Sequence, residues 1–207
     1  MRAEDRRQAI IDAVLPLLVE HGEAVSTRQI AEAAGIAEGT IFRVFPDKNA
    51  LLMAAAAHTL NPPEAGQELA DAVAGIEDLH ELVRVVAERM LVRSEQVMAV
   101  MIALRKVWHT AHEEPVGSRR RAPGAPPAAH AGPPAFVLEA HQALLERLTA
   151  VFEPHRDRLR VPPERAALLL RTLVLGTRHP GVRPEDRLSA ADIADALLHG
   201  ICSEEGD

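Results

Sequence analysis

The organisation of this chain is set by residues 26–52, which read STRQIAEAAGIAEGTIFRVFPDKNALL. Ser26 followed three positions later by Gln29 is a capping box, in which each side chain satisfies a backbone amide at the start of a helix. This helix is expected to stop at Gly35, and a second short helix is expected over residues 37–44 after a tight turn. Two short helices joined in this way have the spacing of a helix-turn-helix.

The segments beside this motif are also predicted to be helical. Apolar residues recur at helical spacing through residues 3–21, and Asp47 is placed to cap another helix after the motif. Pro16 lies inside the first of these segments, so either the helix bends there or tertiary packing holds it. The expected core of this region contains Ile30, Ile36, Ile41 and Phe45.

The rest of the chain is predicted to form longer helices. Residues 61–67 read NPPEAGQ, and their prolines and glycine mark a boundary between domains at 1–60 and 61–207. Residues 113–134 contain nine prolines and glycines in 22 positions, which predicts a disordered loop. The expected helices lie near 76–90, 97–108, 136–152, 163–175 and 189–201. The fold class is therefore all-α, with an N-terminal three-helix helix-turn-helix domain and a larger C-terminal helical bundle.

Composition narrows the function classes. The chain has 207 residues and one cysteine, and a single cysteine excludes a disulfide framework. Its net charge of −7 disfavours coating of nucleic acid by bulk charge. Residues 1–60 carry six basic and eight acidic side chains, so any DNA binding must be local. No apolar run approaches the ~20 residues of a membrane span, and the start MRAEDRRQAI does not have the pattern of a signal peptide. We therefore expect a cytoplasmic protein without membrane contact.

Residues 8–54 resemble the DNA-binding domain of the TetR-type (tetracycline-repressor-like) transcriptional regulators. The resemblance is carried by the capped helix at Ser26, the sequence AGI at the turn, Gly39 and Thr40, the aromatic Phe42, and FPDK before the next helix. The remaining two thirds of the chain match this family only in architecture. The resemblance implies a homodimer that binds palindromic double-stranded DNA and acts as a repressor, released by a small apolar or amphipathic effector.

The DNA-contacting residues follow from the resemblance and from the geometry of a helix-turn-helix, whose second helix enters the major groove. They are expected to be Thr27, Arg28, Glu38, Gly39, Thr40, Phe42, Arg43 and Lys48. Phe42 stands where the family usually has Tyr, so a hydroxyl-to-phosphate hydrogen bond is missing. Glu38 repels phosphate unless it accepts a hydrogen bond from a cytosine amine. A flexible arm is expected to bring Arg2, Arg6 and Arg7 to phosphates.

Effector and dimer contacts are expected in the larger domain. Large or adaptable apolar groups and a histidine suit a ligand pocket, although each is also an ordinary core residue at helical spacing. The pocket candidates are Met90, Met98, Met101, Trp108, Phe136, His141 and Phe152, with His109 as a further polar contact. The last two helices are expected to form a four-helix bundle with their mates, or else to complete a monomer core. The interface candidates are Leu169, Thr172, Leu173, Ile193, Leu197 and Ile201.

Other features of the sequence carry less chemistry. His109 and His112 lie three residues apart and suit a metal site, but a solvated helix end explains them better, and no metal or cofactor is expected. Arg119–Arg121 is best explained as a solvated charge run, and Cys202 is a lone thiol. No catalytic motif is present, so an enzyme is not expected. The alternative function is a helical protein-interaction or small-molecule-binding module that does not bind DNA.

Overall fold

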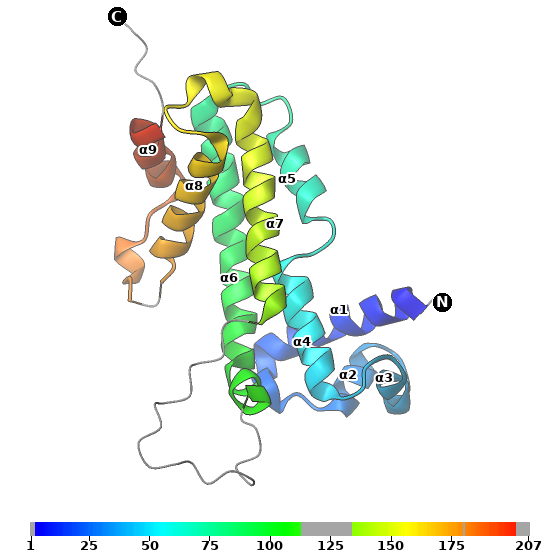
Figure 1. Cartoon of the computed structure of the whole chain (residues 1–207). Helices are drawn as coiled ribbons and strands as arrows, with labels where there is room; N and C mark the ends of the chain where they lie inside the picture. Colours follow the sequence, from blue (N-terminus) through cyan, green and yellow to red (C-terminus); the bar gives the residue numbers. More distant parts are fainter. Residues whose placement is uncertain (1–2, 113–133, 180, 202–207) are drawn as a thin grey trace, which may run out of the picture. The chain divides into compact units, whose positions relative to one another are not determined.

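The computed structural model describes residues 3–112, 134–179 and 181–201. In these ranges every regular element is a helix and no strand is present, so the all-α fold class is confirmed. Several predictions concern residues outside the described ranges: the expected loop at 113–134 (except Pro134), Arg2, Arg119–Arg121 and Cys202. The described structure also leaves out the side chains of Trp108, His109, His112 and Ile201. The helices are α1 (Ala3–His21), α2 (Thr27–Ala33), α3 (Glu38–Val44), α4 (Lys48–Leu60), α5 (Ala65–Val73), α6 (Leu79–His112), α7 (Ala135–Phe152), α8 (Pro163–Thr177) and α9 (Ala190–Ile201), with 3-10 turns η1 (Gly22–Ala24), η2 (Glu153–Arg158) and η3 (Pro184–Asp186) (Figure 1).

The chain divides into two compact units. Unit 1 comprises Met1–Leu60 and Met98–Leu138, and unit 2 comprises Asn61–Val97 and Glu139–Asp207. Unit 1 thus adds residues 98–138 to the segment 1–60 that the sequence singles out. Each unit has a hydrophobic core of its own.

The core of unit 1 is built around the helix-turn-helix. Helix α1 runs without a break through Pro16, and the flanking Val14 and Leu18 are fully buried. The helices are held together by buried apolar side chains that include Ile10, Ile30, Ile41, Phe45, Leu51, Val100 and Leu104. Ile36 is partly buried against this core. Gly35 adopts a φ of +64°, a left-handed conformation that glycine reaches without strain and that allows the tight turn between α2 and α3.

The helix starts of unit 1 follow their sequence signals. The amide of Gln29 donates to Ser26 Oγ at 3.2 Å, and the amide of Ser26 donates to Gln29 Oε1 at 2.8 Å, so the predicted capping box is confirmed. The Asp47 carboxylate accepts a hydrogen bond from the Ala50 amide at 2.7 Å, which confirms the predicted cap of α4.

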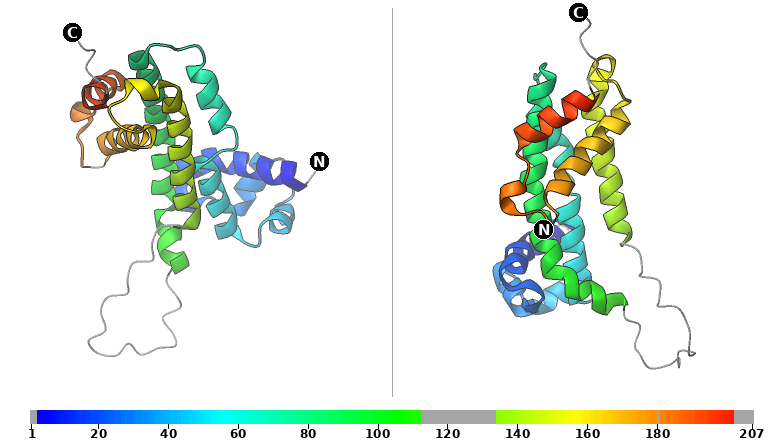
Figure 2. Two further views of the ribbon diagram at one scale, coloured as in Figure 1. Left: turned by 45° about the horizontal axis from the view of Figure 1, so that its top comes forward. Right: turned by 90° about the vertical axis from the view of Figure 1, so that its left-hand side faces the viewer.

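Unit 2 packs its helices around a second apolar core. In Figure 1 and in the left-hand view of Figure 2, α8 and α9 lie on the opposite side of α6 and α7 from α5. Fully buried members of this core are Val83, Val86, Leu148, Phe152, Leu170, Val174 and Ile193. None of the helices in the described part of the chain combines the length and hydropathy needed to cross a membrane.

One prediction of helix boundaries is wrong. The segments expected at 76–90 and 97–108 belong to one helix, α6, because no proline or glycine interrupts the chain between them. Ile76 lies in the turn before it. Helix α5 begins at Ala65, within the residues 61–67 whose prolines and glycine are expected to mark the domain boundary. Prolines are tolerated just before and at the start of a helix, and the Pro62 carbonyl accepts the Ala65 amide at 3.2 Å.

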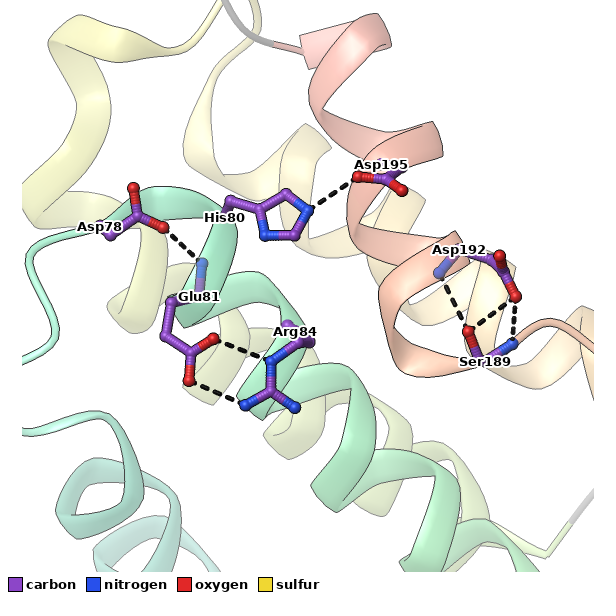
Figure 3. Close-up of polar contacts among 7 residues, drawn as sticks. All are labelled: Asp78, His80, Glu81, Arg84, Ser189, Asp192 and Asp195. Carbon is purple, nitrogen blue, oxygen red and sulfur yellow. Dashed lines mark hydrogen bonds and ion pairs between the residues drawn. The ribbon is translucent and has the colours of Figure 1, made fainter.

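Polar side chains cap and connect the helices of unit 2 (Figure 3). Asp78 accepts from the Glu81 amide at 2.7 Å. At the start of α9, Asp192 accepts from Ser189 and the Asp192 amide donates to Ser189 Oγ at 3.1 Å, so the pair caps this helix. These hydrogen bonds from Ser189 hold the pKa of Asp192 below its usual value. His80 Nε2 lies 2.8 Å from Asp195 Oδ1 and so connects α6 with α9.

Ser26→Ala is expected to destabilise unit 1 by about 1 kcal/mol, because the amide of Gln29 loses its acceptor. Denaturant unfolding followed by circular dichroism measures this loss. Ser26→Asn serves as the control, since its side-chain oxygen also accepts from the first helical turn. Equal midpoints for Ser26→Ala and the unchanged protein would contradict a stabilising role for the box.

Candidate nucleic-acid interface and cavity

Helix α3 presents a polar and aromatic face outside the core of unit 1. Ile41 is fully buried on its inner side, whereas Glu38, Gly39, Phe42 and Arg43 are exposed. These four positions follow i, i+1, i+4, i+5 spacing and therefore share one face of the helix. Phe42 is 49% exposed, which is unusual for so large an apolar side chain without a partner to cover it.

Gly39 leaves the first turn of this face bare. A Cβ atom added at Gly39 meets no atom within 4 Å, so the protein itself does not require glycine there. Thr40, the next residue, is partly buried. The backbone at Gly39 is accordingly open to close approach by another molecule.

Thr27 and Glu38 connect the starts of α2 and α3. The Thr27 hydroxyl donates a hydrogen bond to Glu38 Oε1. The sequence places both residues at the DNA but does not reveal that they are partners. The 11-residue separation hides this contact from any helical-spacing pattern, and only the turn at Gly35 brings the two helix starts together.

The candidate cations of unit 1 differ in their surroundings. Arg28 Nε lies 3.8 Å from Glu32 Oε1 one turn along α2, and both side chains are largely exposed, so this ion pair is weak. The side chain of Arg43 is exposed near the end of α3. Lys48 is partly buried at the first position of α4.

The flexible arm is a wrong prediction for Arg6 and Arg7. Both residues lie within α1, which already begins at Ala3, and both are partly buried. The Arg7 guanidinium stacks over the Phe45 ring at 4.6 Å from its centroid, a cation–π contact that holds it against unit 1.

A cavity of about 520 Å³ lies within unit 2. Its walls come from α5, the turn before α6, the first part of α6, the end of α7 and η2. Apolar lining residues include Leu69, Val73, Ile76, Leu82 and Val151, and the charged or titratable ones are Glu77, Arg147 and His155. The volume falls within the range of small-molecule sites, about 300–1,000 Å³.

None of the predicted pocket residues lines this cavity. Phe152 is fully buried in the core of unit 2, and Met90 is packed against the same core. Phe136 packs against the core of unit 1. Met98 is 38% exposed, Met101 is partly buried and His141 is exposed. Their role in ligand binding stays a prediction.

The predicted interface residues fall into two groups. Ile193 is fully buried and Leu197 is 3% exposed, so both pack inside their own chain and position α9. Leu169 and Thr172 are exposed on α8, and Leu173 is partly buried. The outer surface of α8 also carries Leu168 and Leu175, which are 37% and 41% exposed.

In the described part of the chain, no group of three His, Cys, Asp or Glu side chains lies close enough together to bind one metal ion.

Sequence comparison identifies residues 10–55 with the family model of bacterial regulatory proteins, tetR family. The HTH-type transcriptional repressor KstR of Rhodococcus jostii (strain RHA1) is 47% identical over 55 residues, which are 26% of this chain and 26% of that protein. The chain thus aligns with about a quarter of this curated relative. The likeness covers the helix-turn-helix and little else.

Structural comparison extends over nearly the whole chain. A protein of Mesorhizobium loti MAFF303099 assigned to the same family superposes with a TM-score of 0.67 at 16% identity, covering 98% of this chain and all of the other. SmeT, the repressor of the Stenotrophomonas maltophilia multidrug efflux pump SmeDEF, gives a TM-score of 0.60 at 22% identity, covering 96% and 91%. The complex of SmeT with triclosan gives 0.57 at 24% identity, covering 97% and 93%. At such identities the likeness establishes the fold alone.

Proposed function

The chain belongs to the tetR family of bacterial regulatory proteins through its N-terminal domain, and on that basis we propose that it is a sequence-specific transcriptional regulator, acting as a repressor that a small molecule releases from DNA. The observation that carries this proposal is the outer face of α3. It exposes Gly39, Phe42 and Arg43 on a helix that follows a capped partner helix across a glycine turn. A helix-turn-helix places such a face in the major groove.

Each DNA-facing residue has a distinct role in this proposal. Arg43 reads a base edge, and Thr40 tunes base preference beside it. The ring of Phe42 packs on the sugar-phosphate backbone. Arg28 and Lys48 contact phosphates, which fixes the register of the protein on the duplex without reading sequence.

The functional division of the chain follows. Residues 1–60 bind DNA, and residues 61–207 bind the effector and form the homodimer. The exposed leucines of α8 support the dimer, because a stripe of large apolar side chains on one helix is normally covered by a partner. A two-fold dimer sets two α3 helices about one turn of DNA apart, so a palindromic site in cytoplasmic DNA is its natural target.

A small-molecule effector is supported by the cavity in unit 2. SmeT, which shares the fold, forms a complex with triclosan. The effector changes DNA affinity if it binds one arrangement of the dimer better than another.

Selection from random DNA duplexes tests the proposed function. The full-length protein is incubated with the pool at physiological salt, and the retained duplexes are sequenced after several rounds. Enrichment of one palindrome is the expected result. The selection is repeated with decanoate, a small amphipathic carboxylate used as a trial effector. If no sequence is enriched in either experiment, sequence-specific DNA binding is overturned.

Glu38→Gln is expected to raise affinity for random DNA several-fold at low salt. The substitution removes a negative charge from the DNA-facing surface and keeps an oxygen that accepts from Thr27. The gain shrinks as salt screens the interaction. Fluorescence anisotropy with a random duplex, measured over a salt series, follows this change.

Glu139→Gln is the matched control, because Glu139 is an exposed carboxylate on α7 in unit 2. A different role for Glu38 would follow if Glu38→Gln left the affinity for random DNA unchanged but lowered the affinity for the selected palindrome about tenfold or more. A loss of that size is roughly the value of one base contact. Glu38 would then be a base-reading acceptor for a cytosine amine.

A further inference from the structure

We propose that the cavity between α5, α6 and α7 binds an amphipathic monoanion, a molecule with one apolar body and one carboxylate or sulfonate that pairs with Arg147. The regulatory meaning of this site rests on the proposed function, whereas binding of the ligand does not. The site lies in unit 2 alone, since every lining residue belongs to it.

The body of the ligand is specified by apolar walls. Leu69 and Val73 of α5 face the cavity together with Leu82 of α6 and Val151 of α7. Small residues at Gly66, Ala70 and Ala150 leave the space between these walls empty. A hydrocarbon chain or an aromatic ring that fills the space removes apolar surface from water, at about 25 cal/mol per Å².

The anionic group is specified by Arg147. Its Nη2 donates to Asn61 Oδ1 at 2.5 Å, and this acceptor is a neutral amide. A guanidinium offers five N–H donors and prefers to pair with a carboxylate through two parallel hydrogen bonds. Arg147 is partly buried, so its positive charge is less screened by water than a charge on the open surface.

Gly66 leaves room for this guanidinium. A Cβ atom added at Gly66 would lie 3.5 Å from Arg147 Nε, so the arginine lies against the first turn of α5. The Asn61 side-chain oxygen accepts a hydrogen bond from Nη2 of the same guanidinium. The pair of contacts presents Arg147 as a preformed edge of the cavity wall rather than as a free side chain.

Arg93 on α6 lies in the same electrostatic neighbourhood. Burial lowers the pKa of Arg93, the negative charges of Glu68 and Glu64 oppose this lowering, and the positive charge of Arg147 adds to it.

The rest of the cavity lining disfavours a second anionic group. Glu77 adds a carboxylate to the lining, which repels a second anion. Burial and the neighbouring Arg158 lower the pKa of His155, so this imidazole is neutral at pH 7 and is available for a hydrogen bond to a neutral polar group. The ligand is consequently a monoanion and not a dianion.

Calorimetric titration of the full-length protein with decanoate, decanol and decylamine tests the proposal at pH 7 and without DNA. Decanoate is expected to bind once per chain and more tightly than the other two. Arg147→Gln is expected to weaken decanoate at least about tenfold, the value of one charge-assisted pair, and to leave decanol unchanged. Arg89→Gln, an exposed arginine of α6 outside the cavity, is the matched control.

Ala150→Trp provides the second variant. It fills the cavity from a position that is itself exposed, so the fold tolerates the larger side chain, and it is expected to weaken decanoate and decanol alike. Thermal unfolding of each variant checks that the fold is retained. Absence of decanoate binding, tightest binding of decylamine, or equal decanoate affinity of Arg147→Gln and the unchanged protein would overturn the proposal.

Selection from random duplexes separates the anion site from the proposed function. Decanoate binding without enrichment of any DNA site rejects the regulator and retains the anion site. Enrichment of a palindrome without decanoate binding does the reverse.

Discussion

Arg43→Ala is expected to lower affinity for the selected palindrome by about 30-fold to 10⁴-fold while affinity for random DNA changes little. A good bidentate contact to a base is worth about 1–3 kcal/mol of discrimination, and in a dimer the substitution removes this contact from both half-sites. The fold is expected to stay intact, because Arg43 is exposed near the end of α3 and lies outside the core of unit 1.

Competition titrations measure this effect with the palindrome and a random duplex of equal length. Lys48→Ala is the instructive comparison, because removal of a phosphate-binding cation weakens binding to all sequences alike and reduces the salt slope by about one per phosphate. Arg89→Ala, on α6 in unit 2, controls for the general loss of a positive charge. If Arg43→Ala weakens both duplexes equally, Arg43 contacts phosphate and the base reader is another residue of the α3 face.

The elements of unit 1 could be predicted because their signals are local. Ser26 with Gln29, Gly35 and Asp47 each act within one helical turn or one tight turn, and the structure contains the corresponding caps and the turn. Secondary structure of this kind needs no knowledge of tertiary packing. The link between Thr27 and Glu38 could not be foreseen in the same way, since it depends on the angle between two helices.

Helix α6 shows a different limit of pattern analysis. Its apolar residues serve two cores, because Val83 and Val86 pack in unit 2 whereas Val100 and Leu104 pack in unit 1. The polar stretch 93–96 separates the two apolar segments, so the pattern looks like two amphipathic helices. Only the uninterrupted run of helix-permitting residues between them indicates that the helix is single.

The cavity could not be predicted from large side chains. Methionines and aromatic rings fill space, so Phe152 and Met90 pack in or against the core of unit 2. The empty volume instead lies where the small residues Gly66, Ala70 and Ala150 meet. Small residues on neighbouring helices mark such a space in principle, but their sequence separation hides their proximity until the chain is folded.

Leu169→Glu is expected to convert the protein from a dimer into a monomer and to lower affinity for the palindrome by at least about a hundredfold. The loss of affinity arises because the second half-site no longer benefits from the high effective concentration that linkage of two DNA-binding units provides. In a two-fold interface the same patch meets its own copy, so one substitution introduces two like charges on the packed surface.

Leu169 suits this test because it lies on the exposed face of α8. Leu169 is 38% exposed, and Leu168 and Thr172 are exposed beside it on the same helix. The residues that hold α8 in its own unit, Leu170 and Val174, are fully buried and are left unchanged. A charged side chain at position 169 therefore disturbs association and not the fold.

Sedimentation velocity gives the mass of the particle, and circular dichroism shows whether the helices persist. Val92→Glu is the matched control, because Val92 is an apolar residue 57% exposed on α6 and outside α8. A dimeric Leu169→Glu with a monomeric Val92→Glu would move the interface from α8 to α6. If both variants stay dimeric, the exposed leucines of α8 do not form the dimer interface. The dimer that binds the palindrome would then use a surface that contains neither Leu169 nor Val92.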